Sequence, residues 1–173
     1  VRAAVGDGFA VGCRFLAEEC IDGGSTLPDT THFGLAFAHA GMDFLSTSRG
    51  GKFDDAKAPP VGNAAYPYTG RSGYECMPGY LSDRFGPFGR NVAATTAIRA
   101  AIRDAGLATP IVCTGGIHAF DQAEGLLAAG ACDLVGIARQ ALADPDWPRK
   151  IAGGHGAQVR LCEYTNYCEG LDQ

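Results

Sequence analysis

The sequence predicts an α/β fold in which strands alternate with amphipathic helices and pair as a parallel sheet. Short apolar runs recur between segments whose apolar residues follow the helical spacing. An Ala-Gly pair also closes each of three predicted helices just before an apolar strand, at residues 40–41, 105–106 and 129–130. With 173 residues, 46% of them hydrophobic and 19% charged, the chain is typical of one globular domain, 1–173. Ligands of parallel sheets bind at the carboxyl ends of the strands.

The composition excludes some partners and indicates a compartment. A net charge of −5 argues against binding to nucleic acid or to an anionic membrane surface. No apolar run is long enough to span a bilayer, and no secretion signal opens the chain. The seven cysteines are scattered and odd in number, which predicts reduced thiols and a cytoplasmic location. Because the first residue is Val1 rather than methionine, we expect the chain to begin inside a longer product.

The first predicted strand, residues 11–17, carries Arg14 within an apolar run. A charged side chain inside a buried strand needs a partner. Two interpretations stay open at this point. A neighbouring carboxylate satisfies the arginine, or its guanidinium points into a ligand site at the end of the strand.

A helix is predicted to run from the N-cap candidate Thr26 to about Ala40, because Asp29 suits its first turn. The second strand, residues 42–47, follows this helix and leads into a glycine-containing flexible loop, residues 48–51. These elements form the first complete strand–helix–strand unit of the prediction.

Residues 52–90 show neither helical nor strand periodicity and are rich in Gly, Pro and Tyr. Loops longer than about 12–15 residues are uncommon in compact domains. Aromatic residues need a surface on which to pack, so their number in this segment argues against disorder. We therefore predict a lid over a pocket or an arm at an interface. A surface excursion packed on the outside of the fold is the alternative.

Two amphipathic helices are predicted to flank the third strand. The first has Asn91 as its N-cap candidate, and its buried face is expected to consist of Ala94, Ile98, Ala101 and Ile102. The second is expected to bury a stripe consisting of Phe120, Ala123, Leu126 and Leu127.

Two neighbouring strand ends carry the residues expected to bind an anion. Ile111–Cys113 form an apolar run expected to be buried on both faces, and Gly115 and Gly116 follow it. The next helix is expected to aim its first free N–H groups at the same place. The fourth strand, residues 133–138, is followed by Arg139. Because parallel neighbours end at one edge of a sheet, backbone amides and a guanidinium are expected to bind one phosphate together.

The last part of the chain, residues 155–173, is predicted to be a tail after a final helix. It contains Cys162 and Cys168, which are too few for a tetrahedral zinc site or an iron–sulfur cluster. We expect packed thiols and no metal in this tail.

Four stretches resemble the Old Yellow Enzyme-like NADH:flavin oxidoreductase family in order and spacing. They are VGCRFLAEE, AGMDFLSTSRGG, PIVCTGGIHAFDQAEGLLAAGACDLVGIARQALADPDWPRKI and RLCEYTNYC. The family fold is a β/α (TIM) barrel that binds FMN, and the chain resembles only its C-terminal half, with about four βα units. The resemblance implies that the chain needs the missing N-terminal half-barrel or an oligomeric partner.

The same resemblance implies five cofactor-binding residues. Arg14 matches the strand arginine at the pyrimidine edge of the flavin, where a cation stabilises negative charge on the reduced ring. Gly115 and Gly116 match the backbone cradle of the FMN phosphate, and Arg139 matches the arginine that pairs with this phosphate. Ala138 stands where the family usually has glycine, so its N–H is kept while its methyl group crowds the approach.

The implied activity is that of an FMN-dependent oxidoreductase of the NAD(P)H:flavin oxidoreductase or ene-reductase type. Such an enzyme passes a hydride from NADH or NADPH through flavin N5 to an electrophilic small molecule, often an α,β-unsaturated carbonyl compound. The loop 48–51 resembles the family's loop beside this substrate. No residue matches the family's proton donor, so the catalytic residues stay unassigned. Thr165 replaces the second cysteine of the family's iron–sulfur branch, which argues against a cluster.

Two other classes of protein stay open. A phosphate-binding β/α-barrel enzyme of the isomerase or aldolase type would use the same phosphate site, but no lysine occupies a predicted strand end. A non-catalytic half-barrel fragment or subunit would have two open sheet edges and would aggregate or dimerise without flavin. A mass measurement combined with an absorbance scan distinguishes the three classes.

Overall fold

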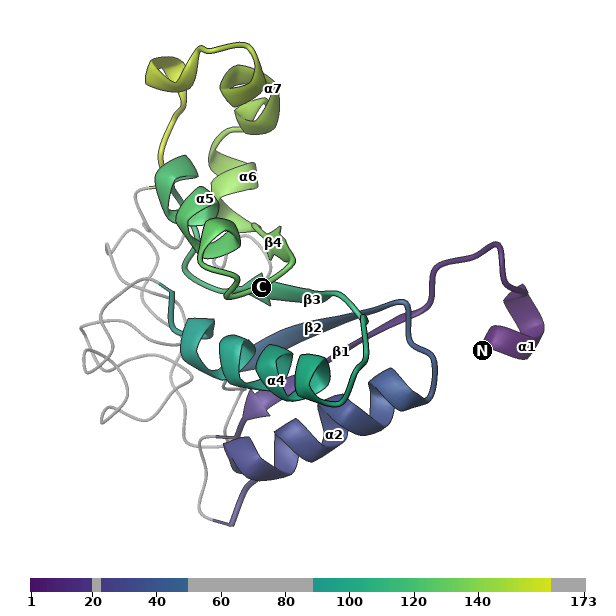
Figure 1. Ribbon diagram of the computed structural model, residues 1–173. Helices are drawn as coiled ribbons and strands as arrows, with labels where there is room; N and C mark the ends of the chain where they lie inside the picture. The colour runs from purple at the N-terminus through teal and green to yellow at the C-terminus, as the bar shows by residue number, and fades with distance from the viewer. Residues whose placement is uncertain (20–22, 50–88, 163–173) are drawn as a thin grey trace, which may run out of the picture. The chain divides into compact units, whose positions relative to one another are not determined.

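The computed structural model of the chain describes residues 1–19, 23–49 and 89–162 (Figure 1). Most of the predicted lid or interface segment, residues 52–90, and the tail beyond Cys162 lie outside these ranges. The chain divides into two compact units, and the first consists of Val1–Arg49, Asn91–Gly115 and Gly125–Gly136. The described parts of the second are residues 89–90, 116–124 and 137–162. The expectation of one domain over 1–173 stays a prediction.

The first unit contains a parallel sheet of four strands in the order β1-β2-β3-β4, as predicted. Each strand pairs in parallel with the next. The strands are β1 Gly12–Glu18, β2 Phe44–Arg49, β3 Ile111–Thr114 and β4 Leu134–Gly136. The fourth strand is shorter than the predicted range 133–138, because pairing with β3 ends at Gly136.

Helices α2 (Leu27–His39) and α4 (Val92–Asp104) lie side by side and pack on the sheet of the first unit (Figure 1). The start of α2 follows the prediction, since the Asp29 carboxylate accepts hydrogen bonds from Thr26 N at 2.8 Å and Thr26 Oγ1 at 2.6 Å. The other helices are α1 Arg2–Val5, α5 Phe120–Ala128, α6 Arg139–Ala143, α7 Trp147–Ala152 and a 3₁₀ turn at Gly156–Gln158. Among the described helices, none combines the length and the apolar character that a membrane-crossing helix requires.

The core of the first unit lies between the sheet and these two helices. Its fully buried residues include Ala17, Leu45, Ile98, Ile102 and Ile111. Burial by apolar contact provides the main stabilisation of such a layer.

Burial alternates along the central strands, which differs from the prediction for β3. Ile111 and Cys113 are fully buried, whereas Val112 and Thr114 are only half-buried. The expectation that residues 111–113 are buried on both faces is therefore wrong for the described chain. The reason is that successive side chains of a strand point to opposite faces, and α2 and α4 cover only one of them.

The structure extends β2 beyond its predicted end and into the predicted loop 48–51. Ser48 and Arg49 belong to β2, and Arg49 pairs with Glu18 of β1 both in register and as an ion pair. Gly50 and Gly51 lie outside the described residues. A charge pair across two strands stabilises their pairing, and a search for apolar runs does not detect it.

The predicted helical faces are correct for α4 except at Ala101 and are partly wrong for α5. Ala94, Ile98 and Ile102 of α4 are buried as predicted, Ala101 is only half-buried, and Thr95 is buried without having been predicted. In α5, Ala123 is buried, but Phe120 and Leu127 are 42% and 40% exposed. Spacing predicts which side chains share a face, but the burial of that face depends on what packs against it.

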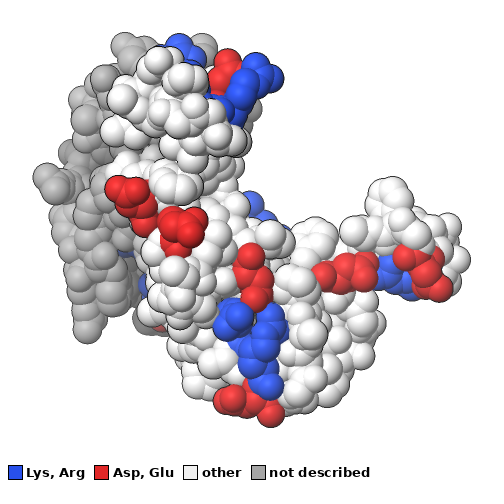
Figure 2. Space-filling view, turned by 45° about the horizontal axis from the view of Figure 1, so that its top comes forward, with Lys and Arg blue, Asp and Glu red and all other residues white. Residues whose placement is uncertain are grey.

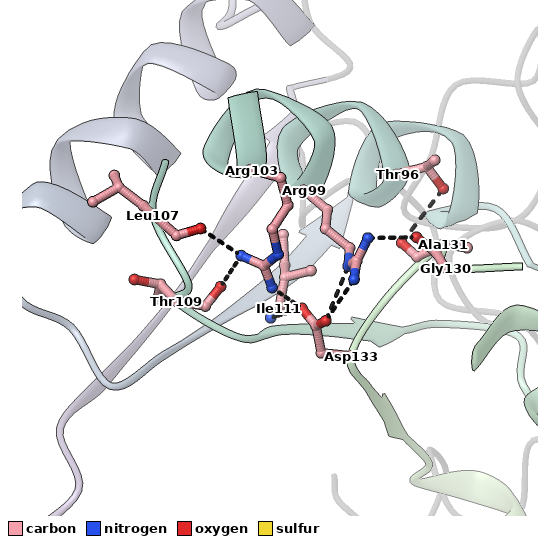
Figure 3. Close-up of polar contacts among 9 residues, drawn as sticks. All are labelled: Thr96, Arg99, Arg103, Leu107, Thr109, Ile111, Gly130, Ala131 and Asp133. Carbon is pink, nitrogen blue, oxygen red and sulfur yellow. Dashed lines mark hydrogen bonds and ion pairs between the residues drawn. The ribbon is translucent and has the colours of Figure 1, made fainter. Parts of the chain in front are cut away.

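A polar network joins α4 to the amino ends of β3 and β4 (Figure 3). The Asp133 carboxylate accepts hydrogen bonds from Arg99 Nε at 3.0 Å, from Arg103 Nη2 at 2.7 Å and from Ile111 N at 2.9 Å. The two guanidinium groups also donate to the carbonyl oxygens of Gly130, Leu107 and Thr109. Basic and acidic side chains likewise lie beside each other on the face shown in Figure 2. This network lies at the strand ends opposite to those that bind ligands, so its role is to hold the fold together.

We expect Asp133→Asn to lower the free energy of unfolding by about 2 kcal/mol, because it removes the charge that two arginines share. Chemical denaturation of the wild type and the variant measures this difference. Asp146→Asn is the matched control, since among the described residues the Asp146 side chain forms only an exposed ion pair with Arg149. We expect the control to change stability by less than about 0.5 kcal/mol. Equal losses in both variants would contradict the role given to Asp133.

The same network makes stability depend on pH in a defined direction. Burial raises the pKa of Asp133, but hydrogen bonds from Arg99, the Ile111 amide and Arg103 outweigh it and lower this pKa below its ordinary value. The contribution is therefore complete above the unfolded pKa of about 3.9 and is lost as the pH falls through the lower folded pKa. Asp133→Asn should lack this part of the acid-induced loss of stability.

Candidate functional site

Gly115 follows β3 directly and adopts a backbone conformation that favours glycine. Its φ is +105°, in the region that other residues rarely adopt. A Cβ atom at this position would lie 3.0 Å from Asn91 Nδ2. Backbone geometry therefore favours glycine at the first position of the predicted phosphate-binding turn, and a larger residue there would also have to displace the Asn91 side chain.

Asn91 has a different role from the predicted one. It precedes α4 as its N-cap residue, but its side chain makes no capping hydrogen bond. Nδ2 donates instead to the carbonyl oxygen of Thr114 at 2.7 Å. The side chain is almost fully buried and spans from the start of α4 to the end of β3.

Gly116, in the second unit, is held by a different side-chain amide. Its φ is +67°, and its carbonyl oxygen accepts a hydrogen bond from Gln122 Nε2 at 2.9 Å. Gln122 Oε1 in turn accepts from His118 N at 3.2 Å. Helix α5 begins at Phe120, so three residues separate it from Gly116. The expected approach of its first N–H groups to an anion stays a prediction.

The carboxyl ends of β3 and β4 lie side by side, because Thr114 pairs in register with Gly136. A Cβ atom on Gly136 would overlap Thr114 Cγ2, so glycine is required for this pairing. Arg139 lies three residues after Gly136 in the sequence and opens α6 in the second unit, with Ala138 as its N-cap residue. The joint binding of phosphate by Gly115, Gly116 and Arg139 stays a prediction.

Arg14 is the third residue of β1 and is exposed. It pairs in register with Ser46, but its Nη2 donates to Ser48 Oγ at 3.1 Å, further along β2. The guanidinium therefore extends toward the carboxyl end of the sheet. Among the described residues Arg14 forms no ion pair, and its contact with a ligand stays a prediction.

Two buried polar side chains fix the described start of the tail within the second unit. Gln140 donates to Arg160 O at 2.7 Å and accepts from Cys162 N at 3.0 Å. Asp144 accepts from Lys150 Nζ at 2.6 Å and from Arg160 N at 2.9 Å. The chain is therefore anchored up to Cys162, while Thr165 and Cys168 lie outside the described residues.

The buried cysteines of the first unit are poor nucleophiles. Burial raises the pKa of Cys113 to about 11 and also raises the pKa of Cys132. A thiol reacts through its thiolate, so both groups should be inert when the chain is folded. In the part of the chain that the structure describes, no group of three or more His, Cys, Asp or Glu side chains could hold a metal ion.

We expect Cys113 to resist alkylation at pH 8 in the folded protein, because a pKa of about 11 leaves roughly one thiol in a thousand ionised. Mass spectrometry of the peptides after timed alkylation, with and without denaturant, measures this protection. Cys13, which is half-buried, is the internal comparison. Modification of Cys113 at the same rate with and without denaturant would contradict the expectation.

A sequence profile described as the NADH:flavin oxidoreductase / NADH oxidase family matches residues 90–158. The match includes both segments predicted to bind phosphate, at Gly115–Gly116 and at Arg139. The predicted family resemblance is thus confirmed. The NADH oxidase of Thermoanaerobacter brockii is 26% identical to the chain over 166 residues, which are 96% of this chain and 21% of that protein.

Solved structures confirm the predicted fold class. A 2-naphthoyl-CoA reductase in complex with 2-naphthoyl-CoA superposes with a TM-score of 0.70 and 21% identity, over 95% of this chain and 21% of that one. An Old Yellow Enzyme homologue from Zymomonas mobilis gives a TM-score of 0.50 and 16% identity, over 90% of this chain and 37% of that one. The chain therefore spans only about a fifth, 21%, of the length of the NADH oxidase of Thermoanaerobacter brockii that it matches.

Three side chains near the predicted site were not identified from the sequence as part of it. Asn91 was expected to be a helix cap, Ser48 to be part of a flexible loop, and Gln122 received no role. Their partners in the structure are Thr114, Arg14 and Gly116. The first two pairs join residues 23 and 34 positions apart, so local patterns carry no signal for them. Gln122 lies six residues from Gly116. The only sequence signal for its contact with Gly116 was that it is a polar residue in the first turn of the predicted helix.

Proposed function

We propose that this chain is the FMN-phosphate-binding part of an NAD(P)H-dependent flavin oxidoreductase. The observation that carries the proposal is the family match over residues 90–158, which contains every residue predicted to contact the phosphate. The predicted cofactor-binding residues are Arg14, Gly115, Gly116, Ala138 and Arg139. The described geometry supports the proposal at Gly115 and Arg14.

The residues present suit FMN. Gly115 has a positive φ at the end of β3, as expected of a glycine turn whose backbone amides face a phosphate. Arg139 supplies a guanidinium, whose planar donors match phosphate oxygens. Arg14, oriented by Ser48, supplies a cation for the electron-rich edge of a reduced ring. When bound, FMN supplies hydride transfer, and the residues of this chain bind and orient it.

The sheet supports the proposal that the chain is half of a β/α barrel. Helices α2 and α4 cover one face of the sheet. The other face carries Arg14 and Leu134, which are exposed, and Ser46 and Val112, which are half-buried. In a closed barrel this face lines the interior and is covered by the remaining strands. We propose that these strands come from the rest of a longer protein or from a partner.

The substrate is proposed to be a small electrophilic molecule that accepts the hydride, with no nucleic acid or membrane partner. The family resemblance assigns no proton donor in this chain, and we propose that the rest of the barrel supplies it. The buried, reduced cysteines support a cytoplasmic location.

The test is to purify the natural protein from its complete coding region and to identify the ligand that denaturation releases. We expect FMN, and we expect NADH or NADPH to bleach the bound flavin. A colourless protein that releases a phosphorylated metabolite would instead indicate the isomerase or aldolase class. A protein that aggregates or dimerises without any ligand would indicate a non-catalytic half-barrel.

A further inference from the structure

The carbonyl group of Thr114 is held by a side chain from a distant part of the first unit. Asn91 Nδ2 donates to Thr114 O at 2.7 Å, which is a short hydrogen bond between neutral groups. Asn91 is 5% exposed, so water does not compete strongly for this bond. This hydrogen bond, called the tether below, therefore acts on the peptide group between Thr114 and Gly115.

The orientation of this peptide group determines where the Gly115 amide points. A trans peptide is planar, and its C=O and N–H bonds point in opposite directions. When Asn91 binds the Thr114 carbonyl, the Gly115 N–H must point away from Asn91. Without the tether the peptide could rotate, because glycine adopts many backbone conformations.

Asn91 is itself held by a chain of hydroxyl groups in the core. The main-chain carbonyl oxygen of Asn91 accepts a hydrogen bond from Thr95 Oγ1 at 2.7 Å, and Thr95 Oγ1 lies 2.7 Å from Thr47 Oγ1. Either hydroxyl can donate in the second bond, and Thr47 Oγ1 also lies 3.4 Å from Val112 O. Asn91 is therefore fixed relative to both α4 and β2.

The other end of the Asn91 amide indicates that this residue does more than stabilise the fold. Asn91 Oδ1 is buried and has no hydrogen-bond partner among residues 1–19, 23–49 and 89–162. A buried acceptor without a partner reduces the stability that its residue contributes. The hydrogen bond from Nδ2 is the other contribution of this side chain, and it orients the peptide before Gly115.

We propose that Asn91 is a positioning residue for the phosphate of FMN. It holds the Thr114–Gly115 peptide in the orientation that presents the Gly115 amide, so the ligand does not have to order this peptide when it binds. The inference rests on the proposed function, because it assumes that the turn binds phosphate.

The test compares the affinities of the natural protein for FMN and for riboflavin, which lacks the phosphate. Asn91→Ala should weaken FMN binding about 5- to 30-fold, the effect of ordering one backbone residue, and should leave riboflavin binding unchanged. Asn91→Asp, which keeps the size but loses the donor, should weaken FMN binding at least as much. Because Asp preserves packing, it keeps the test valid if the alanine variant does not fold.

Thr30→Val is the matched control for a general loss of stability. Thr30 is 1% exposed, and its hydroxyl donates to Ala17 O at 2.6 Å in the edge strand β1, two strands away from β3. We expect the control to be less stable and to keep the wild-type preference for FMN over riboflavin. A wild type without this preference would overturn the proposed function, and the inference with it. A wild-type preference that persists in both Asn91 variants would overturn the inference alone.

Discussion

Gly115→Ala is expected to lower the affinity of the natural protein for FMN about 100-fold, because the turn must change shape and withdraw its amides from a charged ligand. Alanine is strained at a φ of +105°, and its Cβ would lie 3.0 Å from Asn91 Nδ2. We also expect the free energy of unfolding to fall by about 1–3 kcal/mol. Flavin titration and chemical denaturation measure the two effects.

Gly125→Ala is the matched control, since it makes the same chemical change in the exposed part of α5. Gly125 has nothing within 4 Å of its Cβ position, so alanine fits. Glycine inside a helix is less favourable than alanine, and the control should therefore gain about 0.5–1 kcal/mol and keep FMN. If Gly115→Ala kept its FMN affinity and its stability as Gly125→Ala is expected to do, the role assigned to Gly115 would be contradicted.

Arg139→Ala is expected to weaken FMN binding about 10- to 100-fold, because hydrogen bonds between a guanidinium and a phosphate are among the strongest in proteins. Riboflavin affinity should not change, since the missing interaction involves only the phosphate. Arg139→Lys should fall between the wild type and the alanine variant, because lysine keeps the charge but not the planar pair of donors.

Arg149→Ala provides the comparison for a loss of positive charge in the second unit. Its side chain is 86% exposed and pairs only with Asp146 among the described residues. We expect it to bind FMN like the wild type. If the Arg139→Ala protein kept full FMN affinity, the assignment of Arg139 to the phosphate site would be wrong.

The elements that the sequence predicted correctly depend on local information. The start of α2 could be predicted because Thr26 and Asp29 are three residues apart and bond each other. The apolar face of α4 follows from the spacing of its apolar residues. The position of β3 follows from Gly106, which ends the helix, and from Pro110, which precedes the strand.

The features that the prediction missed depend on contacts between distant residues. The ion pair between Glu18 and Arg49 extends β2 into a segment that looked like a loop. Phe120 and Leu127 follow helical spacing, but nothing in their spacing says how much of the face is covered. Asn91 is a good N-cap by residue type, yet its amide binds Thr114, 23 residues later.

The proposed function depends on one location, that of the FMN phosphate, and a crystal structure of the natural protein with bound FMN measures it directly. We expect phosphate oxygens within hydrogen-bond distance of the amides after β3, at Gly115 and Gly116, and of the Arg139 guanidinium. A phosphate bound elsewhere, or an Arg139 side chain that faces away from those amides, would contradict it.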